Sequence, residues 1–151
     1  MAIVALAVHN AEELVRDLPG WQAERPWLPG GAVYGDQAQF AGALAIVTGA
    51  VLVLAVAAVA GRTAWSAPVL VCVGYALLVN AMGHVLLSVV TWSLMPGVIT
   101  SVLVLVPVAV LLARTLPPVR WTASTVLVTL VAAVGLVLGS LVIAALVGAV
   151  L

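Results

Sequence analysis

Four long stretches of almost uninterrupted apolar residues restrict this sequence to membrane folds. They cover residues 40–60, 67–90, 97–113 and 122–151, and each is near the ~20 residues that a helix needs to cross the hydrocarbon core of a bilayer. Only 7% of the 151 residues are charged and 66% are hydrophobic, whereas about a quarter of the residues are charged in a soluble domain. The sequence therefore predicts an all-α integral membrane protein with four transmembrane helices in a single bundle, as one membrane domain over residues 1–151.

A shorter membrane helix is predicted at the amino terminus, over residues 1–18. Ala, Leu, Val and Glu favour a helix there, and Pro19-Gly20 is expected to end it. At ~1.5 Å per residue this helix is ~27 Å long, so the sequence leaves open whether it crosses the membrane or only enters it. Residues 19–39 are rich in Pro and Gly and contain Trp21 and Trp27, which is typical of an interfacial loop on the membrane surface.

The charges predict an orientation in the cell membrane and exclude one class of partner. All five acidic residues precede residue 40, whereas Arg62, Arg114 and Arg120 lie in the short loops at 61–66 and 114–121. Arginine-rich loops favour the cytoplasmic side, so this multi-pass protein is predicted to have its C-terminus outside. The net charge of zero argues against a nucleic-acid partner. The expected partners are the lipid bilayer and a lipophilic small molecule, and a homo-oligomer is compatible with the sequence.

The most polar stretch of the amino-terminal segment is His9-Asn10-Ala11-Glu12-Glu13. On a helix, residues three and four apart share a face, so His9 is expected to face both Glu12 and Glu13, with Arg16 on the same side one turn later. These residues form one candidate polar cluster.

A second polar stripe lies in the apolar span 67–90, where Asn80 and His84 are followed at helical spacing by Ser88 and Thr91. At ~1.5 Å per residue, His84 and His9 come out at a similar depth in the outer half of the bilayer. Ionisable groups at such a depth usually face a cavity or a partner. We therefore predict that the amino-terminal helix packs on the span 67–90 and that the two clusters form one site.

These motifs resemble the HXXEE domain family of small membrane proteins. The family is characterised by the His-x-x-Glu-Glu motif, by a further histidine, which would be His84, and by a Tyr-x-Pro-Gly motif. The last motif corresponds to Leu94-Met95-Pro96-Gly97, in which Leu94 replaces the tyrosine. The resemblance covers roughly residues 1–115. It supports the site and implies no particular reaction.

Three interpretations of the site follow. The polar residues could tie helices together by hydrogen bonds alone. Alternatively, they could form a membrane enzyme for isomerisation, cyclisation or hydrolysis of an isoprenoid or acyl lipid, because a carboxyl group beside a histidine can act as an acid/base pair. In the third interpretation, a divalent metal such as Zn, Fe or Mn binds to the histidines and carboxylates. We prefer the enzyme interpretation, with no cofactor expected. Its candidate catalytic residues are His9, Glu12, Glu13, Asn80 and His84, and its candidate substrate-binding or lid residues are Arg16, Trp21, Tyr75 and Trp92.

Overall fold

The computed structural model of the chain describes residues 1–28, 31–61 and 64–149. All regular secondary structure in this part of the chain is helical, with no strand. The elements in chain order are α1 (Ala2–Val15), α2 (Leu18–Ala23), α3 (Gly31–Tyr34), α4 (Gln37–Gly61), α5 (Ser66–Thr91), α6 (Val98–Thr100), the π-helix η1 (Ser101–Leu105), α7 (Val106–Thr115) and α8 (Ala123–Gly148).

Four helical runs are long and apolar enough to cross a membrane, which confirms the predicted fold class. They are α4, α5, the continuous run Val98–Thr115 and α8. Large apolar side chains such as Val53, Leu86 and Leu127 are exposed on them. In a soluble protein such extensive apolar exposure would be unusual, whereas lipid covers it in a membrane. The chain is thus a multi-pass helical membrane protein.

The third of these runs is irregular in its first half. Pro107 stands in the first turn of α7 and has no backbone N–H, so it removes the donor that an α-helix would offer to the carbonyl four residues earlier. The π-helix η1 lies directly before this turn, at Ser101–Leu105. Single π-helical turns within helices are frequent at functional sites, and this one begins immediately after Thr100.

The amino-terminal helix is shorter than predicted, because α1 ends at Val15. Asp17 adopts a left-handed conformation (φ 52°), and its side chain accepts a hydrogen bond from Gly20 N at 3.1 Å. Pro19 lies in the first turn of α2. The N–H groups of a first turn have no partner within the helix, so proline is tolerated there. The Pro19-Gly20 pair therefore begins a second helix, and the prediction that it ends the first one was wrong.

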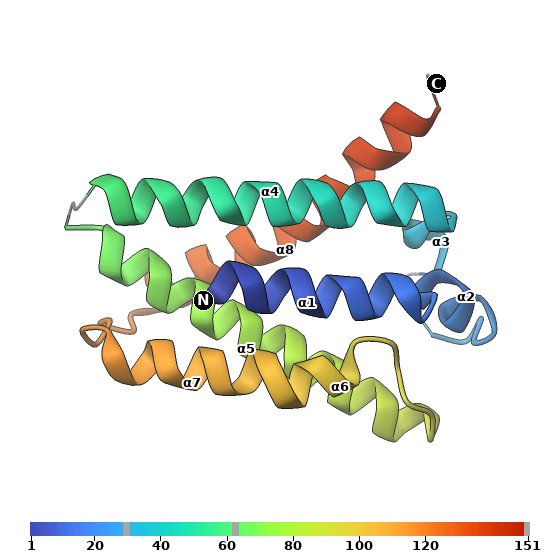
Figure 1. Cartoon of the computed structure of the whole chain (residues 1–151), viewed down its shortest axis with the longest axis horizontal. Coiled ribbons are helices and arrows are strands. Elements are labelled where there is room, and N and C mark those ends of the chain that lie inside the picture. The colour runs from blue at the N-terminus through green and yellow to red at the C-terminus, as the bar shows by residue number, and fades with distance from the viewer. Residues whose placement is uncertain (29–30, 62–63, 150–151) are drawn as a thin grey trace.

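Figure 1 shows α1 beside α4, along only the right-hand part of that helix. With 14 residues, α1 is about 21 Å long and too short to cross a bilayer. Its C-terminal end, α2, α3 and the α5–α6 turn lie at the right-hand end in the view, and the α7–α8 connection lies at the other (Figure 1). Arg120 lies in that connection, whereas Arg62 falls outside the described residues.

Residues 19–39 form more than the interfacial loop expected from the sequence. They contain α3 and most of α2, and α2 is packed into the end of the bundle with Leu18, Pro19, Trp21 and Gln22 buried. Proline and glycine in this segment therefore shape helix ends as well as loops.

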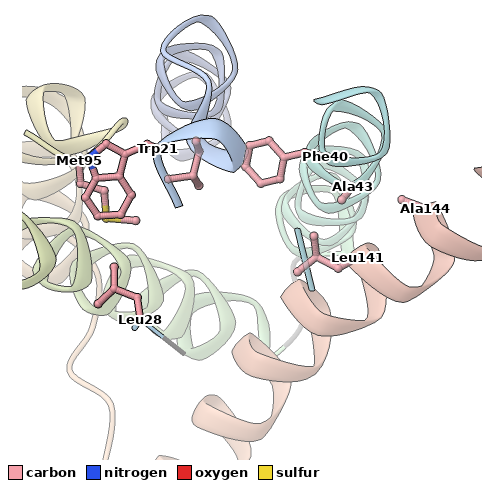
Figure 2. Close-up of a cluster of buried hydrophobic side chains, with 8 residues drawn as sticks. Trp21, Leu28, Phe40, Ala43, Met95, Leu141 and Ala144 are labelled. Carbon is pink, nitrogen blue, oxygen red and sulfur yellow. The ribbon is translucent and has the colours of Figure 1, made fainter. Parts of the chain in front are cut away.

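Two apolar clusters hold the bundle together, one at each side of the predicted site. The outer cluster joins α2 to α4 and α8 (Figure 2) and consists of Leu18, Trp21, Leu28, Phe40, Ala43, Met95, Leu141 and Ala144. The inner cluster joins α1 to α4, α5, η1 and α7 and consists of Ala5, Leu6, Val51, Leu77, Ala81, Leu105 and Ala109. Along the chain, His9 falls between Leu6 of the inner cluster and Leu18 of the outer one.

Candidate functional site

A buried cluster of two imidazoles and one carboxylate is the centre of the molecule's polar interior. Glu13 Oε1 lies 2.9 Å from His84 Nε2 and 3.3 Å from His9 Nε2. All three residues are buried, and His9 is fully buried. Burial of ionisable groups without partners is strongly unfavourable, so the three side chains depend on one another for polar contacts.

The cluster is assembled from α1 and α5. His9 and Glu13 are four residues apart on α1 and so face the same way, and His84 reaches them from α5. The two imidazole rings meet edge to face with centroids 4.7 Å apart. The predicted meeting of the two histidines is therefore found in the structure.

Gly97 closes the cluster from a third element, the turn before α6. Its φ of +91° lies in the left-handed region that favours glycine. A Cβ at this position would lie 2.8 Å from Cε1 of both His9 and His84 and 2.9 Å from His84 Nδ1. The Pro-Gly pair of the Leu94-Met95-Pro96-Gly97 motif thus allows the backbone to approach both rings. Leu94, which stands in the tyrosine position of this motif, is 62% exposed.

Glu12 has different surroundings from Glu13. Its carboxylate accepts hydrogen bonds from Thr100 N at 2.7 Å, Thr100 Oγ1 at 2.6 Å and Ile99 N at 3.4 Å. Arg16 Nη1 pairs with it at 3.2 Å. The expectation that both carboxylates face His9 directly was wrong for Glu12, because the start of α6 offers it several donors.

Thr100 connects Glu12 to His9, since its hydroxyl also lies 3.1 Å from His9 Nδ1. The sequence did not single out Thr100. The available signal was a pair of adjacent hydroxyl residues, Thr100 and Ser101, at the start of a span whose other residues are apolar. Arg16 does not enter the buried cluster and touches it only through Glu12.

Asn80 completes the contacts of His9, with Nδ2 2.9 Å from His9 Nε2. The other members of the predicted polar stripe have separate partners at the end of α5. Ser88 Oγ accepts a hydrogen bond from Met95 N at 2.9 Å, and Thr91 Oγ1 donates to the carbonyl of Leu87 at 2.7 Å. The stripe therefore divides into a part at the cluster and a part that holds the α5–α6 turn.

The candidate lid residues lie in three different places. Trp21 is buried in the outer cluster, donates from Nε1 to Ser93 Oγ at 3.1 Å and packs under the guanidinium of Arg25. Trp92 is 94% exposed at the end of α5. Tyr75 contacts the ring of Trp121, which follows α7, so it stands away from the His–Glu cluster.

The cluster also has a composition suited to a metal ion. His9, Glu13 and His84 can each bring one ligand atom to within 4.8 Å of the others. Two imidazoles with one carboxylate form a ligand set used for Zn and for non-haem Fe. Metal–ligand bonds of about 2.1 Å at angles between 90° and 110° separate the ligand atoms by about 3.0–3.4 Å, close to the two contacts of Glu13.

The comparison with protein families fits these three motifs. A family described as "Protein of unknown function with HXXEE motif" matches residues 1–112. The chain belongs to this HXXEE family. The match includes His9, Glu12, Glu13, His84 and Gly97 and ends within α7, before α8 begins. Comparisons with curated proteins and with solved structures give no match.

Proposed function

We propose that this HXXEE protein is a membrane enzyme that performs acid/base chemistry on a lipophilic substrate. The observation that carries the proposal is the state of His84. Its Nε2 is hydrogen-bonded to the Glu13 carboxylate at 2.9 Å, while its Nδ1 is buried and has no hydrogen-bond partner among the described residues. Buried polar atoms nearly always have partners, and exceptions call for a specific explanation such as a catalytic role.

The pair Glu13–His84 has the geometry of an oriented general base. A carboxylate that accepts from one ring nitrogen fixes the tautomer and leaves the lone pair on the other nitrogen. Here that lone pair is on His84 Nδ1. After the ring takes a proton from the substrate, the adjacent Glu13 stabilises the imidazolium, so the pair can later return the proton to another atom.

The location of the pair favours a lipophilic substrate. The cluster lies within the bundle, between two apolar layers. Apolar side chains such as Leu94 and Ile99 are exposed next to Gly97. A proton acceptor and donor suffice there for isomerisation or cyclisation of an isoprenoid, and hydrolysis of an acyl lipid needs a water molecule in addition. Asn80 is a polar group beside His9.

The proposal can be tested before the substrate is known. The purified protein is incubated with a membrane lipid extract in D₂O or in H₂¹⁸O, and the lipids are analysed by mass spectrometry. Proton transfer to carbon would introduce deuterium, and hydrolysis would introduce ¹⁸O. We expect labelled lipids with the wild-type protein and at least ~100-fold less label with His84→Gln or Glu13→Gln, in line with the size of acid/base contributions.

Thr48→Val is the matched control, because Thr48 also takes part in a hydrogen bond between helices, in which its Oγ1 accepts from Asn10 Nδ2 at 2.8 Å, and its hydroxyl donates within α4 to the Leu44 carbonyl. It should label lipids as the wild type does. Lipids that acquire no label, or equal label with all four proteins, would contradict the proposal.

A metal-dependent function is the second candidate, because His9, Glu13 and His84 form a compact ligand set. The same preparations therefore go to elemental analysis. A full equivalent of Zn, Fe or Mn, lost in both His9→Ala and His84→Ala, would replace the metal-free proposal. Bound metal would also stabilise the fold, so chelation would then lower the melting temperature.

A further inference from the structure

We infer that Glu12 and Thr100 form a hydrogen-bond relay that fixes the tautomer of His9, with the proton on Nδ1 and the lone pair on Nε2. The relay makes Thr100 a positioning residue of the site, although it belongs to none of the three motifs. Only the use of this tautomer in catalysis rests on the proposed function. The tautomer itself follows from the contacts of Glu12.

The charge of Glu12 follows from its hydrogen-bond partners. In the described part of the chain, the hydrogen-bond partners of its carboxylate are all donors, namely Thr100 N, Ile99 N, the Thr100 hydroxyl and the Arg16 guanidinium. An ionised carboxylate accepts only, and several donors with one cation favour that form. Glu12 is therefore an acceptor for the Thr100 hydroxyl.

The Thr100 hydroxyl has a single proton to donate. Its shortest contact is with Glu12 Oε2 at 2.6 Å, compared with 3.1 Å to His9 Nδ1 and 3.3 Å to the Gly97 carbonyl. A hydroxyl that donates to a carboxylate keeps its lone pairs for other donors. The proton between Thr100 and His9 must then come from the ring, so His9 Nδ1 donates to Thr100 Oγ1.

The protonation of His9 Nδ1 determines the state of the other ring nitrogen, Nε2. A neutral imidazole with a proton on Nδ1 has a lone pair on Nε2. The amide of Asn80, 2.9 Å away, can donate to that lone pair. The 3.3 Å contact between His9 Nε2 and Glu13 Oε1 is then no hydrogen bond from His9, which leaves His84 as the ring that donates to Glu13.

This arrangement gives the two adjacent glutamates of the motif different tasks. Glu12 acts on His9 from one side, through Thr100, and Glu13 acts on His84 from the other. Each histidine is thus oriented by its own carboxylate. The nitrogens left with a lone pair are His9 Nε2, which accepts from Asn80, and His84 Nδ1, which lies toward Gly97.

The test reads the ring protons directly. The full chain, in detergent micelles and with ¹⁵N-labelled histidine rings, is studied by NMR, where protonated and unprotonated ring nitrogens differ widely in chemical shift. The chain has only two histidines, so His84→Gln assigns the signals. We expect wild-type His9 to carry its proton on Nδ1. Thr100→Val, which keeps the shape and removes the hydroxyl, should shift His9 toward the Nε2-protonated form.

Thr100→Ser should restore the wild-type pattern, and Thr48→Val, the matched loss of a hydroxyl outside the cluster, should keep it. A wild-type His9 that is protonated on Nε2, or on both nitrogens, would overturn the inference, and this measurement needs no Thr100 variant. An unchanged His9 in a folded Thr100→Val protein would overturn it as well. Loss of lipid labelling in His84→Gln with an unaltered His9 tautomer in Thr100→Val would reject the relay and leave the proposed function standing.

Discussion

At the scale of single residues, Gly97 is where backbone conformation and the site depend on each other. We expect Gly97→Ala to lower the free energy of unfolding by about 2 kcal/mol or more, because a left-handed conformation costs a non-glycine residue ~1–2 kcal/mol and overpacking adds ~1–3 kcal/mol. The new Cβ would collide with both imidazole rings at 2.8 Å. Thermal unfolding in detergent, followed by circular dichroism, measures the change.

Gly49→Ala is the control for this substitution. Gly49 lies within α4, and a Cβ there would meet nothing within 4 Å. Alanine is the better helix former by about 1 kcal/mol, so stability should stay constant or rise. Equal melting temperatures for wild type and Gly97→Ala would show that the rings can move away and that Gly97 is not needed for their contact.

The sequence predicted the pairing of His9 and Glu13 but not the separate role of Glu12. Spacing of three and four residues along a helix places both carboxylates near the histidine's face, and spacing is all that the pentad shows. The choice between them is made by Ile99 and Thr100, which are 87 and 88 residues away from Glu12 in the chain, respectively. Such a contact depends on the tertiary packing of α1 on α6, for which the sequence gives no local signal.

At the scale of elements, α6 begins without a cap of its own, because Gly97 has no side chain to accept from its first N–H groups. Glu12 of α1 supplies this acceptor for Ile99 N and Thr100 N. We expect Glu12→Ala to destabilise the protein by about 1–3 kcal/mol, the usual effect of leaving partly buried donors unpaired. Chemical unfolding curves of wild type and variant give the difference.

Glu24→Ala is the matched control at the element scale. Glu24 is also an acidic residue paired with an arginine, but its side chain is 76% exposed. An exposed ion pair contributes little, so the control should change stability by less than about 1 kcal/mol. A Glu12→Ala protein as stable as the control would show that α6 does not depend on α1 for its cap.

The lengths of the elements explain which of them the sequence could predict. The four long spans were predicted within a few residues, because a bilayer demands ~20 apolar residues in each. The end of α1 was misplaced, since Asp17 in a left-handed conformation starts α2 only two residues after α1 ends. The π-helical turn at Ser101–Leu105 was not predicted either. Pro107 leaves a carbonyl in the preceding turn without its usual backbone donor. This effect can be recognised only when it is known that the helical run Val98–Thr115 continues through Pro107.

At the scale of the whole molecule, the bundle has two chemically different ends. Near one end, Arg16 and Arg25 are paired with Glu12 and Glu24. At the other end stand Arg114 and Arg120, and no acidic residue follows Asp36 in the sequence. The orientation rule counts the basic residues of short loops, and three of the five arginines lie at 61–66 and 114–121 in the sequence. The arginine-rich end is therefore expected inside and the end with α2 outside.

Cysteine labelling of intact cells tests this orientation. In a Cys72→Ala background, Leu94→Cys and Pro118→Cys place single thiols at the two ends, both at exposed positions. A membrane-impermeant maleimide should label position 94 in intact cells and position 118 only after permeabilisation. The opposite pattern would invert the bundle and move the His–Glu cluster to the inner half of the bilayer. Because α1 lies alongside the α2 end of α4 (Figure 1), the orientation also decides from which leaflet a lipid would reach His84.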